Sequence, residues 1–189
     1  MLHMLAGACL TVAVAGGADL PRPSPDFAVT TLGGQQIRVS QYKGKVCALA
    51  FILTTCPHCQ KTIENLSIMQ NTYGARGFQV LASAIEDMAA MNLPDFIKRF
   101  HPPFPVGFNN QNEVQEYLQH PVILRLLMPQ VVFIDRQGTI RAQYAGDDKF
   151  LSDEENLDKH LREQIEALLK DAPGPRKKRA AAPAAKKAS

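Results

Sequence analysis

Two cysteines, Cys56 and Cys59, at the end of an apolar run constrain the fold of this chain more than any other feature. The run, residues 46–53, has the length and near-continuous hydrophobicity of a strand buried on both faces. The segment after it has helical spacing, so the strand delivers Cys56 to a helix N-terminus, where free N–H groups and the helix dipole favour a thiolate. Pro57 suits the first helical turn because its missing N–H costs nothing there. The motif Cys56-Pro57-His58-Cys59 therefore predicts thiol–disulfide chemistry.

The rest of the sequence disfavours two other uses of such a pair. Structural zinc needs a second cysteine pair or two histidines at ligand spacing, and Cys9 and Cys47 form no such pair. Attachment of a c-type haem needs a histidine directly after the second cysteine, where Gln60 stands. A purely structural disulfide stays open, since short-loop disulfides occur in exported proteins. We predict no bound metal or cofactor, with the cysteine pair as the redox centre and Cys47 as a small buried residue.

The charge of the chain is unevenly placed. Of its 189 residues 21 are basic and 18 acidic, and six of the basic ones lie in residues 172–189, which leaves 15 basic residues in the rest. The body is therefore slightly acidic and is not expected to bind nucleic acid. The tail, residues 172–189, consists largely of Ala, Pro, Lys and Arg and is predicted to be disordered, with at most a weak contact with a membrane surface.

The first eighteen residues are apolar and small and resemble a secretory signal peptide, although they contain no Lys or Arg. An uncleaved anchor or a misplaced start codon are the alternatives. We expect an exported protein, located in the bacterial periplasm or anchored to the membrane with its domain facing the periplasm. Residues 19–25, with three prolines, are predicted to form an extended linker.

Strand and helix signals alternate through residues 26–171, which indicates one domain with a central sheet covered on both faces. The pattern begins with a hairpin across Gly33-Gly34 and ends with a helix whose start is predicted at a capping box of Ser152 and Glu155. Pro94 is expected to break a helix over 87–100 or to begin a second one. The other predicted strands are 46–53, 78–85, 106–108, 131–134 and 139–144, with helices after Cys59 and around Val114–Leu118.

With these features the chain resembles the thioredoxin fold, and more narrowly the redoxin or TlpA-like branch of exported thiol–disulfide oxidoreductases. The resemblance covers residues 24–170 and rests on the hairpin, Gly44-Lys45-Val46, the cysteine motif, the helical insert and the stretch 129–138. It implies an α/β three-layer sandwich with a central mixed sheet, an N-terminal β-hairpin and a helical insert.

The resemblance also implies roles for residues outside the motif. In the family, a proline matching Pro129 has a cis peptide bond and packs against the active disulfide, and the backbone of the preceding residue, here Met128, meets the substrate. Glu86 matches a glutamate that faces the cysteines and could accept or relay the proton of Cys59; the alternative is a solvated glutamate at a strand end. The chain departs from the family pattern at Thr55, where a tryptophan is usual, and at Met128, where a small or β-branched residue is usual.

These residues imply a mechanism whose direction the sequence leaves open. Cys56 attacks a substrate disulfide and Cys59 resolves the mixed disulfide, with protein dithiols or disulfides and an unidentified redox partner as reactants. A protonated His58 would lower the pKa of Cys56 and favour an oxidant, as the same Pro-His dipeptide does in DsbA. The resemblance of the rest of the domain to TlpA-like proteins favours a reductase.

Two other functions stay as alternatives. A peroxiredoxin-like thiol peroxidase shares this fold, but its family places a threonine three residues before the reactive cysteine, where Leu53 stands here. A copper-binding metallochaperone would use soft thiolates with a distant histidine, for which His101 and His120 are candidates only by default.

Overall fold

The strands of the protein form a single sheet of eight strands. The computed structural model describes residues 18–171, so the predictions for the signal peptide, Cys9 and the basic tail lie outside the described residues. In spatial order the strands are β1 (Arg22–Pro23), β8 (Thr139–Tyr144), β7 (Gln130–Ile134), β4 (Val46–Ile52), β5 (Phe78–Ala84), β6 (Val106–Phe108), β2 (Ala28–Thr30) and β3 (Gln36–Arg38). The pairs β4–β5 and β5–β6 are parallel and the other pairs antiparallel, which makes the sheet mixed, as predicted.

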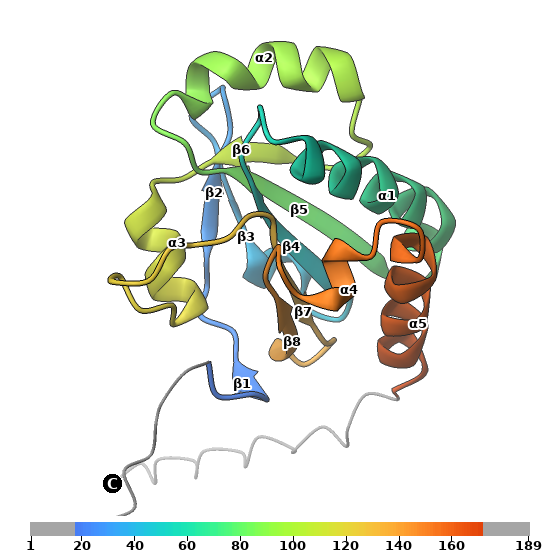
Figure 1. Ribbon diagram of the computed structural model, residues 1–189. Helices are drawn as coiled ribbons and strands as arrows, with labels where there is room; N and C mark the ends of the chain where they lie inside the picture. The colour runs from blue at the N-terminus through green and yellow to red at the C-terminus, as the bar shows by residue number, and fades with distance from the viewer. Residues whose placement is uncertain (1–17, 172–189) are drawn as a thin grey trace, which may run out of the picture.

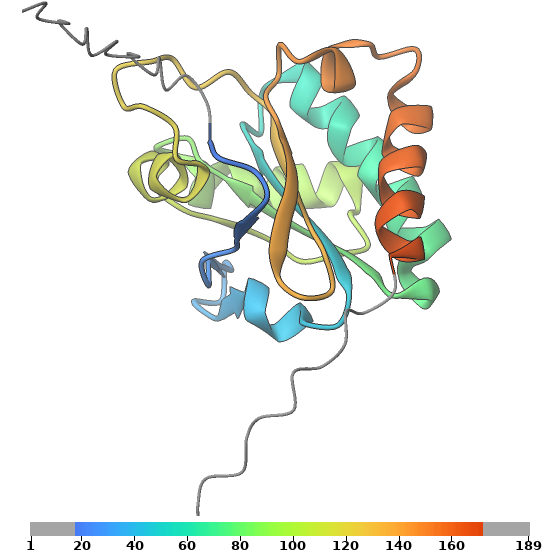
Figure 2. The same ribbon diagram turned by 90° about the horizontal axis from the view of Figure 1, so that it is seen from below.

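Helices cover both faces of this sheet (Figures 1 and 2). One face packs against α1 (Pro57–Tyr73), α2 (Ala89–Phe100), α4 (Lys149–Ser152) and α5 (Leu157–Lys170). The other face packs against α3 (Gln111–Leu118) and the 3-10 helix η1 (Val39–Tyr42); a second 3-10 helix, η2 (Gly74–Arg76), follows α1. The three-layer α/β sandwich is thereby confirmed.

Strand β4 separates the two halves of the core. All seven of its residues are buried. Val46, Ala48, Ala50 and Ile52 face the α1 side, and Cys47, Leu49 and Phe51 face the α3 side. Because side chains alternate along a strand, a strand covered on both faces has to be apolar throughout, which explains the continuous run in the sequence.

Two helix boundaries differ from the prediction. Helix α2 continues through Pro94, which lies inside it, without a break. The proline removes the one backbone hydrogen bond that its N–H would donate, and the other bonds of the helix remain. Ser152 does not cap the final helix: it ends α4, whose N-cap Asp148 accepts a hydrogen bond from the Phe150 N–H at 2.8 Å. Helix α5 begins only at Leu157.

Part of the segment predicted as an extended linker joins the sheet. In β1, Arg22 pairs with Ile140 and Pro23 with Thr139. The Arg22 side chain is buried and donates a hydrogen bond to the Tyr117 carbonyl at the end of α3 at 2.8 Å. None of the helices within residues 18–171 has the length and hydropathy needed to cross a membrane.

Candidate active site

Cys56 lies between the end of β4 and the start of α1, as the sequence predicts. It is the N-cap residue of α1, with extended backbone angles (φ −80°, ψ 120°), and the exposed Pro57 follows as the first helical residue. The Cys56 Sγ accepts a hydrogen bond from the Cys59 N–H at a distance of 3.5 Å. The Cys56 sulfur therefore occupies the position of a capping oxygen, where N–H groups and the helix dipole stabilise negative charge.

Cys59 sits one turn further along α1 and has no exposed surface. Its Sγ accepts a hydrogen bond from the Leu53 N–H at 3.4 Å. Burial raises the pKa of the Cys59 thiol well above its usual value, and the Cys56 sulfur and the Glu86 carboxylate add to the rise. Cys56 and Cys59 are both free thiols in this structure, one half-buried and the other enclosed.

His58 contacts a helix far away in the sequence. Its Nε2 donates a hydrogen bond to the Leu151 carbonyl of α4 at 2.9 Å. Because the carbonyl only accepts, Nε2 holds a proton in both charge states of the ring. The imidazole thus joins the start of α1 to α4, a contact that the sequence gave no reason to expect.

Thr54 holds the half-buried Glu86 carboxylate in place. The Thr54 N–H donates to Glu86 Oε1 at 3.1 Å, and the Thr54 hydroxyl donates to the same oxygen. The second carboxylate oxygen, Oε2, is buried without a hydrogen-bond partner within residues 18–171. The structure therefore places this carboxylate near the buried Cys59, whose pKa it raises.

Met128 and Pro129 directly precede β7, and Met128 borders the same cavity as Cys56. Their peptide bond is cis, as the resemblance implies. The backbone of Gly146 approaches so closely that a Cβ on it would lie 2.2 Å from the Met128 carbonyl oxygen. The Gly146 N–H donates a hydrogen bond to the Leu127 carbonyl at 3.2 Å. The same carbonyl also accepts a hydrogen bond from the Gln130 side chain at 2.6 Å. Only glycine fits at position 146 in this arrangement.

An open cavity of about 320 Å³ connects the attacking cysteine with this segment. Its lining residues are Leu53, Cys56, Arg125, Leu126, Leu127, Met128, Gly146 and Asp147. Cys56 and Met128 thus border one space, which is open to an incoming chain.

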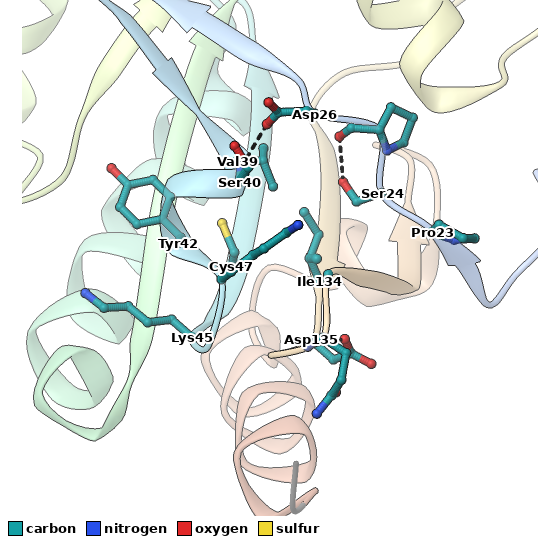
Figure 3. Close-up of a pocket in the computed structure, with 14 residues that line it drawn as sticks. Pro23, Ser24, Asp26, Val39, Ser40, Tyr42, Lys45, Cys47, Ile134 and Asp135 are labelled. Carbon is teal, nitrogen blue, oxygen red and sulfur yellow. Dashed lines mark hydrogen bonds between the residues drawn. The ribbon is translucent and has the colours of Figure 1, made fainter. Parts of the chain in front are cut away.

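Cys47 takes no part in this site. It is 2% exposed and faces the α3 side of the sheet, opposite to Cys59. Figure 3 shows its sulfur in a separate cavity of about 220 Å³, beside Tyr42 and Val39. Burial raises the pKa of Cys47 to about 12, only partly offset by Lys45. Cys47 is therefore a buried residue, as predicted, and a buried thiol with a raised pKa is a poor nucleophile.

The two histidines considered for copper lie elsewhere. His101 ends α2 with a left-handed backbone (φ 43°), and His120 follows α3 with its Nε2 3.3 Å from the Leu124 carbonyl. Residues 18–171 contain no cluster of three or more His, Cys, Asp or Glu side chains arranged to hold a metal ion.

Thr54 and Gly146 belong to the site although sequence reasoning missed both. Thr54 could have been found from its position between the strand and the cysteines, two residues before Cys56. Gly146 is one of many glycines, and its role depends on a contact with a distant segment that no local pattern announces.

A capping, half-exposed cysteine with a buried partner one turn away, beside a cis-proline segment, defines a thioredoxin-fold thiol–disulfide exchange site. Residues 21–143 match the model of the AhpC/TSA family, and the chain belongs to that family.

Individual relatives point to the same chemistry. The thiol-disulfide oxidoreductase ResA of Geobacillus kaustophilus (strain HTA426) is 27% identical over 139 residues, 73% of this chain and 74% of that protein. ResA of Bacillus thuringiensis subsp. konkukian (strain 97-27) is 26% identical over 80% of this chain and 78% of that protein. A crystal structure from Chlorobium tepidum, provisionally named as the thiol:disulfide interchange protein DsbE, has a TM-score of 0.64 and 26% identity, over 78% of this chain and 98% of that one. The protein is a thiol–disulfide oxidoreductase.

Proposed function

We propose that the protein exchanges disulfides with polypeptide substrates, with Cys56 as the attacking and Cys59 as the resolving cysteine. The Cys56 thiolate attacks one sulfur of a substrate disulfide, forms a mixed disulfide and releases the other substrate sulfur as a thiolate. Cys59, once deprotonated, attacks the Cys56 sulfur and releases the second substrate sulfur. Two electrons pass to the substrate, and the Cys56–Cys59 disulfide forms. The reverse sequence oxidises a substrate dithiol.

The observation that carries this proposal is the unequal environment of the two sulfurs. Cys56 is half-buried and lies where a helix N-terminus stabilises a thiolate, whereas Cys59 is enclosed and its pKa is raised. A substrate disulfide can reach only the first sulfur, and only that sulfur is favoured as a nucleophile. This supports the order of attack and resolution given above.

Glu86 acts in this proposal as the base that accepts the proton of the Cys59 thiol. A thiol with a raised pKa needs a base before it attacks, and the buried Oε2 of Glu86 has no hydrogen-bond partner among the described residues. The Thr54 bonds hold this carboxylate in place through its other oxygen.

Replacing Glu86 with glutamine should slow the resolving step near neutral pH by about 100-fold, the lower end of what a positioned base contributes. The rate should be measured by stopped flow on a mixed disulfide preformed at Cys56, across a pH series. Asp87→Asn, an exposed neighbour, serves as the matched control. Because the Glu86 charge raises the pKa of Cys59, a glutamine variant that resolves faster than the wild type would show that the carboxylate acts only through its charge.

The reduction potential tests the direction of exchange and the part of His58. An imidazolium at the start of α1 stabilises the Cys56 thiolate and so favours the reduced protein. His58→Ala should therefore make the reduction potential of the Cys56–Cys59 pair more negative, and a shift of about 30 mV corresponds to a tenfold change in the exchange equilibrium. Equilibration in graded thiol–disulfide buffers gives both values, with the exposed Lys61→Ala on the same helix as a control for charge.

The absolute potential then assigns the direction. A wild-type value near about −120 mV identifies a disulfide donor, and one near about −270 mV a thioredoxin-like reductase. An unchanged potential in His58→Ala would show that the ring acts through its bond to Leu151 alone.

The proposal also includes export of the protein, which the apolar composition of residues 1–18 supports.

A further inference from the structure

Exposed apolar side chains gather on one loop of the protein. The loop between α3 and β7 contains residues 121–127, here named the apolar loop. Val122 is 75% exposed, Ile123 89%, Leu124 52% and Leu127 36%. These four large side chains lie within six consecutive residues, and exposed apolar side chains grouped in this way usually mark a contact surface.

The apolar loop is held in place. Leu126 packs against the core on the α3 side, next to Met128. The Leu124 N–H donates to the Pro121 carbonyl at 2.9 Å, and the Leu127 carbonyl accepts from Gly146 and Gln130. Because these bonds fix the backbone, the loop itself needs little further ordering when it binds a partner.

The last residues of the apolar loop border the cavity of the attacking cysteine. Leu126 and Leu127 line the same cavity of about 320 Å³ as Cys56. A polypeptide whose disulfide reaches Cys56 has its flanking residues in this space, so the surface used by a substrate extends onto the apolar loop.

We propose that the apolar loop binds the apolar residues that flank the reactive cysteine of an unfolded or extended polypeptide substrate. This inference rests on the proposed function and adds the substrate class. A folded protein buries its large apolar side chains, whereas an unfolded segment offers them to a matching surface. Contact with Val122, Ile123 and Leu124 removes apolar area from water on both partners.

The charges nearby favour a polypeptide over a membrane. Contact with anionic lipid is strengthened by several basic residues beside the apolar side chains. The apolar loop contains one, Arg125, and the exposed acid Asp147 lines the same cavity as Arg125. Because basic and acidic residues lie close together here, neither sign of charge on a substrate is favoured. Apolar contact therefore decides which substrates bind.

Two peptides of equal length and charge, each with one internal disulfide, test the inference. In the first, Leu and Val flank the cysteines; in the second, Ser and Asn flank them. Stopped-flow rates with the reduced protein should favour the apolar peptide about tenfold. Ile123→Ser combined with Val122→Ser should bring this ratio to about one. Both replaced side chains are exposed, so the fold is preserved. Met91→Ser, which alters a 70% exposed side chain on α2, should keep the ratio.

Three results would overturn the inference. Equal wild-type rates for the two peptides show no selection, and a ratio unchanged in the double variant places the selection elsewhere. Loss of binding to anionic vesicles in the double variant, with equal peptide rates in the wild type, would identify a membrane contact instead. Failure of the proposed function has a different signature, since the wild type would then not react even with hydroxyethyl disulfide.

Discussion

Replacing Cys56 with serine should abolish disulfide exchange. A serine hydroxyl is not ionised near neutral pH and does not form a mixed disulfide, and the remaining thiol of the pair, Cys59, is enclosed and carries a raised pKa. The rate of disulfide consumption should fall by about 1,000-fold or more, since the thiolate is the nucleophile of the reaction. A peptide disulfide read out by fluorescence, with a dithiol as electron source, measures this loss.

Cys47→Ala is the matched control for this variant. Cys47 lies on the opposite face of the sheet and is buried, so its removal changes packing without touching the exchange site. Activity should persist in the control. Exchange by the Cys56→Ser protein at the wild-type rate would refute the assignment of the attacking cysteine.

Replacing Cys59 with serine should trap the protein on its substrates. Cys56 still attacks, but no second thiol releases the substrate, so a mixed disulfide accumulates with one substrate chain per protein. Intact mass before and after reduction measures the adduct, and peptide mapping should locate it at Cys56. The wild type should show almost none, because its resolving thiol lies one helical turn away.

The double variant Cys56→Ser with Cys59→Ser controls for other thiols. It retains Cys47, which is 2% exposed, and should form no adduct. An adduct on Cys47, or a Cys59→Ser protein that turns over like the wild type, would contradict the assignment of roles.

The parts of the site that the sequence predicted are those encoded locally. An apolar run, a cysteine and a proline in succession define the end of β4 and the start of α1, because strand burial and helix capping depend on neighbouring residues. The cis bond before Pro129 followed from resemblance and not from local physics, since most such bonds are trans.

The unpredicted parts depend on contacts between distant segments. Thr54 and Glu86 are 32 residues apart, and His58 and Leu151 are 93 apart. The capping box at Ser152 was wrong for a related reason. The capping residue Asp148 starts a short helix earlier, and the pattern of Ser152 and Glu155 cannot show which of two nearby starts the packing selects.

The outer strands of the sheet are short, and this limits how other chains can associate with the protein. Strand β1 has 2 residues and β3 has 3, so each edge offers few free backbone groups to an added strand. Capture of a client by β-augmentation, which needs a longer open edge, is therefore disfavoured at both ends of the sheet. Edge-to-edge aggregation between copies of the protein is disfavoured by the same property, because neither edge offers a long row of unpaired backbone groups.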